Sequence, residues 1–449
     1  MNTKQFLLEE CENVRSTLQE ALRHDYSAGS SEEFYKEFRV RLTQLSKLIE
    51  STGLDDVFLL RELAFELSLL STLLHKIERS HAGEFSWPFA ERLKNLAIPL
   101  CRDKFLPAGN DPIIRVYAEG GLGSYKINLE DDLSRLFNNK RIFTIVFPRT
   151  LKHHVLLHTI FGHEIGHAAW IIPAQQADLK KKVLTPLRRE GPLTSSSSAE
   201  IWLEKAKAPT LLEQIRRRDP DPGKFKFNRQ KYDSWFEEFM CDLFGVVTFG
   251  PSFVAAHQTL LLGLDPTGYS WGPRHPPYAC RKAMLRQACK HLHWDTYDKK
   301  IRGGSLRSHV RKFLDTYLDS SAPDPWEDVF TQKQVADAVD ALNEILTGAG
   351  TTSFTMPDEL ALSKLIGMLA ERIPPCGSDI SGSENPKNHV IDFRYILMAG
   401  WIASSNVTSL TPKKEKILDF SQINKLCEMG ILHQRAIDLN HERKKKAKP

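Results

Sequence analysis

Hydrophobic positions recur at helical spacing through most of this chain. In the first hundred residues they do so in four segments separated by short polar stretches. These segments are Phe6–Leu22, Phe34–Ile49, Val57–Ile77 and Phe89–Cys101. The same spacing returns in five later segments, Leu306–Leu318, Thr331–Leu346, Asp358–Arg372, Ile391–Ala403 and Ser421–Asn440. The pattern predicts a small helical bundle at the N-terminal end and a helical region at the C-terminal end.

Strands are predicted only in the middle of the chain. Ile113–Ala118 and Ile142–Phe147 are rich in β-branched and aromatic residues and are bounded by Gly, Asn and Pro, as strands commonly are. We expect them to belong to a small sheet. The second run is predicted to be an edge strand on which an extended substrate could pair through main-chain hydrogen bonds.

Two further helices and a long irregular segment follow these strands. The spacing predicts helices over Thr150–Trp170 and Tyr232–Phe249, with a stop signal directly after the second. Residues 171–230 between them are basic, broken by prolines and rich in serine. We interpret this segment as an insertion or mobile lid, in which Ser197 and Glu200 form a capping box.

The predicted fold is α+β and mostly α-helical, in three regions. Residues 1–105 form an N-terminal helical bundle, and residues 106–300 form a middle domain with the sheet. Residues 301–449 form a C-terminal helical domain that ends in a basic tail. A chain of 449 residues is long enough for two to three domains of ordinary size.

Composition and charge narrow the classes of protein. With 41% hydrophobic and 26% charged residues the chain is globular, which excludes collagen-like and wholly disordered proteins. A net charge of +5 is too small to indicate nucleic acid or an anionic membrane as a partner. Apolar runs are too short for a membrane span. Seven scattered cysteines fit free thiols in a reducing compartment, so we expect a cytoplasmic protein.

One motif carries specific chemistry: His163-Glu164-Ile165-Gly166-His167. On a helix, residues four apart share a face, so His163 and His167 can bind one zinc ion, with Glu164 as general base. Shuffling this composition produces the motif about once in 25 such chains. Its neighbours are apolar, and burying three titratable groups there is costly unless a metal ion compensates. We therefore predict a zinc site.

Two histidines leave a zinc site incomplete, and the predicted helix Tyr232–Phe249 offers the best third ligand. Glu238 and Asp242 are four residues apart and share a face. We predict that Glu238 binds the ion and that Asp242 accepts the free N–H of a ligating histidine. Cys241 is a rival third ligand. Glu237 points about 100° away from Glu238 on the helix and is not expected to bind.

A third block follows, His275-Pro276-Pro277 with Arg281. Together with the HExxH motif and the glutamate helix, it resembles the gluzincin metallopeptidases, most closely the group of the CAAX prenyl proteases and the heat-shock membrane peptidases. The three blocks lie within residues 140–290. The resemblance implies a zincin-like metallopeptidase core. Members of that group carry membrane-spanning helices, which are not predicted here, so prenylated substrates and a membrane location are not carried over.

The predicted function is a zinc-dependent endopeptidase that hydrolyses peptide bonds of a protein or peptide substrate through a metal-activated water. Glu164 acts as general base, and the oxyanion is stabilised by His275 or, second, Arg281, with Tyr232 and Tyr278 as more distant candidates. The alternative is a non-enzymatic helical interaction or regulatory protein with a structural zinc site. Under either function, the helical flanks are the surface on which we expect a regulatory partner. Glu164 argues against this alternative, because a structural site needs no base.

Overall fold

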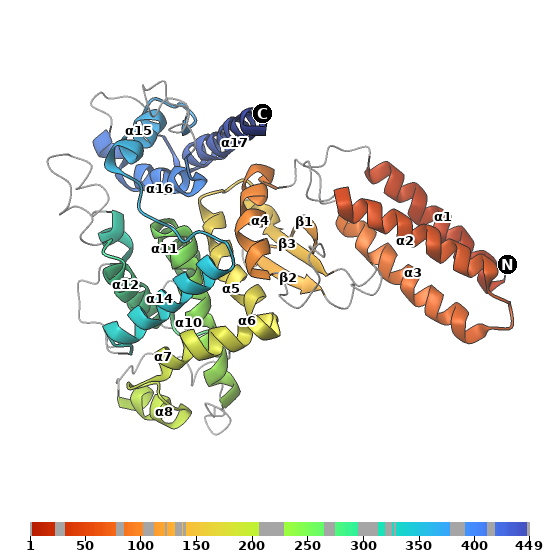
Figure 1. The fold of residues 1–449 in the computed structure, drawn as a ribbon, viewed down its shortest axis with the longest axis horizontal. Coiled ribbons are helices and arrows are strands. Elements are labelled where there is room, and N and C mark those ends of the chain that lie inside the picture. Colours follow the sequence, from red (N-terminus) through yellow and green to blue (C-terminus); the bar gives the residue numbers. More distant parts are fainter. Residues whose placement is uncertain are drawn as a thin grey trace. The chain divides into compact units, whose positions relative to one another are not determined.

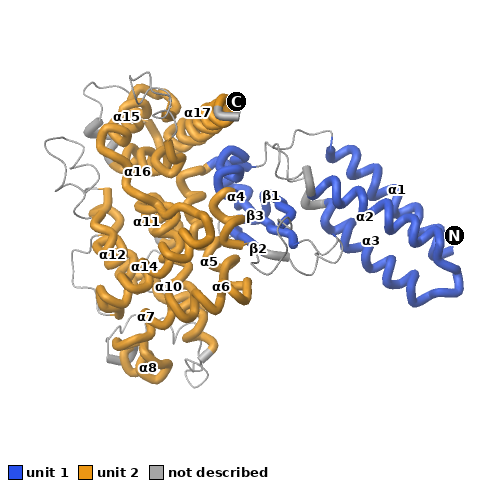
Figure 2. Tube along the Cα trace, viewed as in Figure 1, with its two compact units in different colours: residues 1–94, 102–153 blue, residues 95–101, 154–449 orange. Residues whose placement is uncertain are grey.

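The computed structural model describes residues 2–22, 32–77, 85–101, 112–121, 124–130, 137, 141–205, 229–264, 274–294, 313–318, 326, 329–377, 391–410 and 418–446. Within these residues the protein is mostly helical, with one small sheet (Figure 1). The chain divides into two compact units, residues 1–94 with 102–153 and residues 95–101 with 154–449 (Figure 2). The sheet is thus grouped with the N-terminal helices, and the HExxH segment with the C-terminal ones. This grouping differs from the three regions expected from the sequence.

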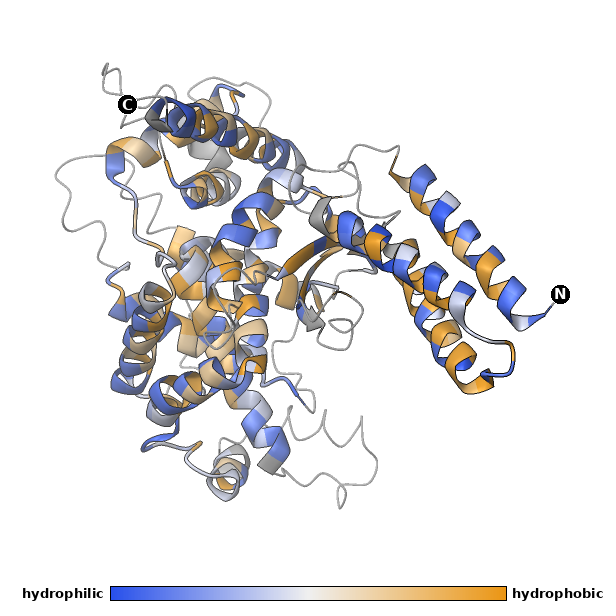
Figure 3. Cartoon of the chain, turned by 45° about the vertical axis from the view of Figure 1, so that its right-hand side comes forward, coloured by the Kyte–Doolittle hydropathy of each residue, from blue (hydrophilic) through white to orange (hydrophobic). Residues whose placement is uncertain are grey.

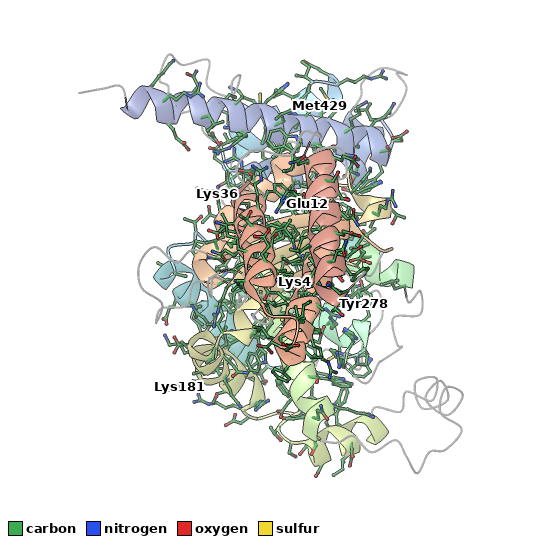
Figure 4. The ribbon with its side chains drawn as sticks, turned by 90° about the vertical axis from the view of Figure 1, so that its right-hand side faces the viewer. Lys4, Glu12, Lys36, Lys181, Tyr278 and Met429 are labelled. Atoms are coloured by element: carbon green, nitrogen blue, oxygen red, sulfur yellow. The ribbon has the colours of Figure 1, made fainter. Side chains whose placement is uncertain are left out.

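The N-terminal helices confirm the four predicted segments. They are α1 (Thr3–Ala21), α2 (Glu32–Ser51), α3 (Val57–Ile77) and α4 (Trp87–Cys101). Apolar and polar residues alternate around α1 to α3, so each helix has an apolar stripe (Figure 3). Lys4, which lies on α1 (Figure 4), donates to the Glu50 carbonyl at 2.6 Å and the Thr52 carbonyl at 3.0 Å. These two bonds occupy carbonyl groups at the end of α2 that the helix itself leaves without partners.

The sheet has three strands, β1 (Ile113–Glu119), β2 (Lys126–Glu130) and β3 (Ile142–Pro148), in the order β1-β3-β2. β1 pairs with β3 in parallel and β2 pairs with β3 antiparallel. The two predicted strands are confirmed, and β2 was not predicted. The expected edge position of Ile142–Phe147 is wrong: β3 is the central strand and buried throughout, because β2 covers its second edge.

The predicted helix over Thr150–Trp170 is broken. Two 3₁₀ turns, η2 (Arg149–Leu151) and η3 (Leu157–Ile160), precede α5 (Phe161–Ile171). The break has a physical cause at Leu156: its N–H donates to Asn424 Oδ1 at 3.0 Å, and its carbonyl accepts from Trp401 Nε1 at 3.1 Å. Partners distant in sequence thus occupy both backbone groups. The HExxH motif therefore begins in the first turn of α5 and not in the middle of a longer helix.

The predicted lid is packed and helical as far as Lys205. It contains α6 (Pro173–Asp178), the π-helical turn η4 (Leu179–Leu184), α7 (Thr185–Arg188) and α8 (Ser196–Lys205). Its apolar side chains Leu179, Val183 and Leu187 are buried. Ser195 accepts a hydrogen bond from the Ser198 N–H at 3.1 Å, so the start of α8 is capped two residues earlier than predicted. The rest of the predicted lid, 206–228, lies outside the described residues.

The second unit is built around α10 (Arg229–Phe249), which packs against α5, α12 and α14. The predicted stop is confirmed, since Gly250 follows α10 with a φ of 64° that favours glycine. Two helices were not predicted, α11 (Pro251–Leu264) and α12 (Tyr278–His291). The C-terminal helices confirm the predicted segments as α14 (Gln332–Gly348), α15 (Glu359–Ala370), α16 (Phe393–Leu410) and α17 (Phe420–Lys446). Of the predicted helix Leu306–Leu318, only residues 313–318 are described, and they are helical.

Candidate metal centre

Three glycines and one cysteine at their crossing let α5 and α10 approach each other closely. A Cβ atom on Gly162 would lie 2.7 Å from the Cα of Gly245, and one on Gly166 would lie 2.9 Å from the Cα of Cys241. Real side chains do not tolerate such contacts, so the crossing requires glycine on α5 at both positions. The two glycines lie directly before His163 and His167. The close approach therefore brings both imidazoles within reach of the side chains of α10.

The two motif histidines point their Nε2 atoms at each other, 3.0 Å apart. Their other ring nitrogens are held by carboxylates of α10: His163 Nδ1 lies 2.9 Å from Asp242 Oδ1, and His167 Nδ1 lies 2.9 Å from Glu237 Oε1. A carboxylate can only accept, so each Nδ1 carries a hydrogen and donates it. Both Nε2 lone pairs then face one small region, where a single cation, a proton or a metal ion, must lie between them.

Glu238 completes this group from the next position on α10. Its Oε2 lies 3.4 Å from His163 Nε2, and its Oε1 lies 3.4 Å from His167 Nε2. Zinc bound tetrahedrally at about 2.0–2.1 Å places neighbouring donor atoms about 3.3–3.4 Å apart, so the spacing fits one ion. Glu238 is buried, and its Oε2 has no hydrogen-bond partner among the described residues. Buried polar atoms normally have a partner, so this oxygen is a suitable ligand for a cation.

Cys241 is a further candidate donor beside the two imidazoles. Its Sγ and the ring nitrogens of His163 and His167 all lie within 4.8 Å of one another, and this buried group could hold a metal ion. Glu238 and Cys241 are three residues apart on α10 and share a face. The structure thus places both candidate third ligands, Glu238 and Cys241, close to the two motif histidines.

Asp242 lies at the centre of a buried ionic network. Arg281 on α12 donates two hydrogen bonds to its carboxylate, both at 2.6 Å, and also lies 3.6 Å from Glu238 Oε2. His257 on α11 places Nε2 3.1 Å from Asp242 Oδ1. Together with His163, these side chains come from four different helices. Asp242 therefore orients the ring of His163 while α11 and α12 hold Asp242 in place.

The electrostatics of the group favour a cation. Burial alone raises the pKa of Glu238, but the adjacent imidazoles and the Arg281 guanidinium lower it to about 2. The pKa of Asp242 is held well below its usual range, because Arg281 and the neighbouring histidines outweigh burial. Burial lowers the pKa of His163 to about 4, so its ring is neutral near pH 7 and can act as a ligand. Two ionised carboxylates thus face a neutral imidazole.

The pKa of His167 is shifted in the opposite direction. Burial lowers its pKa, but Cys241 and the carboxylates of Glu237 and Glu238 raise it above the usual value. A proton on His167 Nε2 then occupies the 3.0 Å gap to His163. Metal binding at this place displaces that proton, as it does at protein histidine ligands in general.

The remaining predicted residues differ in their relation to this group. His275 places Nε2 3.6 Å from Glu238 Oε1 with its side chain 62% exposed, so it lies between the buried ligands and solvent. Glu164 is half-buried in the first turn of α5. The Arg281 guanidinium is engaged by Asp242, which corresponds to a structural ion pair, and its expected catalytic role stays a prediction. The hydroxyl of Tyr232 donates to the Leu193 carbonyl.

Sequence analysis missed two members of the network. Glu237 was set aside because it points away from Glu238, yet it reaches the Nδ1 atom of His167. His257 was missed because the apolar run around it was not recognised as α11. A histidine within the largely apolar stretch PSFVAAHQTLLL was the available sign of a buried polar contact.

Comparison with known proteins does not assign the chain to a family. No protein-family model matches the chain, and neither a curated protein nor a solved structure matches it. Among the described helices, none has the length and apolar character needed to cross a membrane.

Proposed function

We propose that the protein is a zinc-dependent endopeptidase of the gluzincin type, with His163, His167 and Glu238 as the metal ligands. The observation that carries this proposal is the meeting of two Nε2 atoms and both oxygens of a buried glutamate, 3.0–3.4 Å apart, with each imidazole fixed by a carboxylate. Two histidines and one carboxylate are a ligand set that catalytic zinc sites use. The HExxH motif supplies a base in the adjacent position.

The chain's own residues would divide the work as follows. Bound zinc supplies Lewis-acid chemistry, through polarisation of a substrate carbonyl and acidification of a water molecule. Glu164 takes the proton of the attacking water and delivers it to the leaving nitrogen. His275, at the exposed border, donates to the oxygen on which negative charge develops. Asp242 and Glu237 keep the two imidazoles in the tautomer that leaves Nε2 free to bind.

The first test is the metal content of purified protein. Elemental analysis of wild type and the double variant His163→Ala/His167→Ala, both purified without added metal, should give about one zinc per chain and none, respectively. Glu164→Gln should keep the zinc and lose cleavage of an unfolded protein substrate such as reduced casein. Equal zinc content in wild type and the double variant would refute the site.

A structural zinc site in a non-enzymatic protein is the second candidate, and Cys241 favours it. A fourth protein donor closes the coordination shell, and closed shells are typical of structural sites. The two candidates differ in the effect of Glu164→Gln. Under the structural candidate wild type cleaves nothing, and removal of zinc unfolds the protein.

A further inference from the structure

Cys241 lies beside the proposed zinc ligands but is not one of them. Its side chain is fully buried, and its Sγ and one ring nitrogen of each of His163 and His167 all lie within 4.8 Å of one another. A metal ion bound there would hold the thiol as its thiolate, because a coordinating thiol is deprotonated. The position of Cys241 therefore makes it a candidate ligand.

Rotation about a single torsion angle can change the distance from the thiol to the two imidazoles. Tetrahedral zinc places a sulfur donor about 3.6 Å from a nitrogen donor, somewhat closer than the 4.8 Å limit of this group. Rotation of Cys241 about χ1 changes the position of Sγ and no other heavy atom of the residue. Gly166 faces the thiol across the crossing, where a Cβ atom would lie 2.9 Å from Sγ, so the present position of Sγ requires glycine there. Glu238 can bind the same ion from one turn earlier on α10.

The balance of charge among the buried side chains is an independent reason to expect Cys241 as a ligand. The deeply buried side chains of the network are two carboxylates, Glu238 and Asp242, and one guanidinium, Arg281, which together carry one negative charge. A divalent ion changes this to one positive charge in a buried environment. One further anionic donor restores neutrality, which a buried ionic group favours strongly. Cys241 is a buried side chain at the site that can supply that charge.

We propose that Cys241 is a fourth, displaceable ligand, whose thiolate closes the zinc site in the resting protein. This inference rests on the proposed site of His163, His167 and Glu238. Catalysis needs an open coordination position. The thiolate therefore acts as a built-in inhibitor, and a substrate or small ligand must displace it before it can reach the metal.

Cobalt(II) replaces zinc in such sites and reports a bound thiolate by an intense near-ultraviolet charge-transfer band. We expect the full-length cobalt protein to bind one equivalent and to show this band. The band should be lost in both Cys241→Ala and Cys241→Ser and retained in Cys427→Ala, which alters another fully buried cysteine. Two cysteine variants are used so that a folding defect in one of them leaves the comparison intact.

Access to the metal is measured with acetohydroxamate, a small anionic chelator, added to each cobalt protein. We expect it to bind at least about tenfold more tightly to Cys241→Ala than to wild type, because no thiolate has to leave. One equivalent of cobalt without a charge-transfer band in wild type would overturn this inference and leave the His163, His167 and Glu238 site intact. Failure to bind cobalt at all would overturn both.

Discussion

The close crossing of α5 and α10 can be tested by adding one methyl group. In Gly162→Ala the new Cβ would lie 2.7 Å from the Gly245 Cα, whereas ordinary contacts begin at 3.4 Å. The helices must therefore separate by about 0.7 Å at this point, because the new Cβ is fixed by the backbone and the Gly245 Cα is a backbone atom, so neither atom can rotate away. Overpacking of this kind costs about 1–3 kcal/mol. The better helix propensity of alanine returns at most about 1 kcal/mol.

The same displacement acts on the proposed metal site. His163 and His167 lie on α5, and Glu238 on α10, so a separation of about 0.7 Å exceeds the roughly 0.2 Å by which zinc–ligand distances vary. We expect Gly162→Ala to lower zinc affinity at least about tenfold, measured by competition with a chelator of known affinity. Denaturant unfolding of the zinc-free protein should show the stability loss separately from the metal effect.

Gly367→Ala is the matched control for this experiment. Gly367 lies within α15, and a Cβ there would meet nothing within 4 Å. This variant should be as stable as wild type or more stable, by up to about 1 kcal/mol, with unchanged zinc affinity. If Gly162→Ala behaves like Gly367→Ala in both measurements, the crossing is not as tight as the structure has it and the glycine argument fails.

Three further experiments test the carboxylate that orients His163, a helix cap in α14, and the effect of zinc on stability. Asp242→Asn should lower zinc affinity about 10–100-fold, as measured by chelator competition. It should also destabilise the protein by about 3–5 kcal/mol in urea unfolding, because it leaves Arg281 buried without its partner. Thr331→Ala removes the capping box of α14 and should cost about 1 kcal/mol by urea unfolding, with zinc affinity unchanged. Removal of zinc with a chelator should lower the melting temperature of wild type, but not that of His163→Ala/His167→Ala.

Local periodicity was enough to predict most helices and two strands. Val57–Ile77 was predicted with both ends correct, because its apolar positions keep a helical period up to each boundary. Prediction failed where distant partners decide the structure. The backbone groups of Leu156 bind side chains of Asn424 and Trp401, about 250 residues away, and no local pattern reveals this.

The candidate site was predictable in part for the same reason. The spacing of His163 and His167 and that of Glu238 and Asp242 are local helical relations. The edge position of β3 was wrong because it depends on β2, whose pattern was too short to recognise. His257 required knowledge that α11 packs beside α10. A sequence therefore indicates ligands that share a helix more readily than the groups that orient them from other helices.

The arrangement around the motif argues against a chance HExxH sequence. A chance motif provides two imidazoles four residues apart and nothing else. Here each Nδ1 atom is bound by a carboxylate from a helix at least 70 residues away, Asp242 for one and Glu237 for the other. Glycine lies directly before each histidine, where a Cβ would keep that helix at a distance. Separate positions on two helices thus hold the two Nε2 atoms close together, which is the arrangement that a cation bound between them would require.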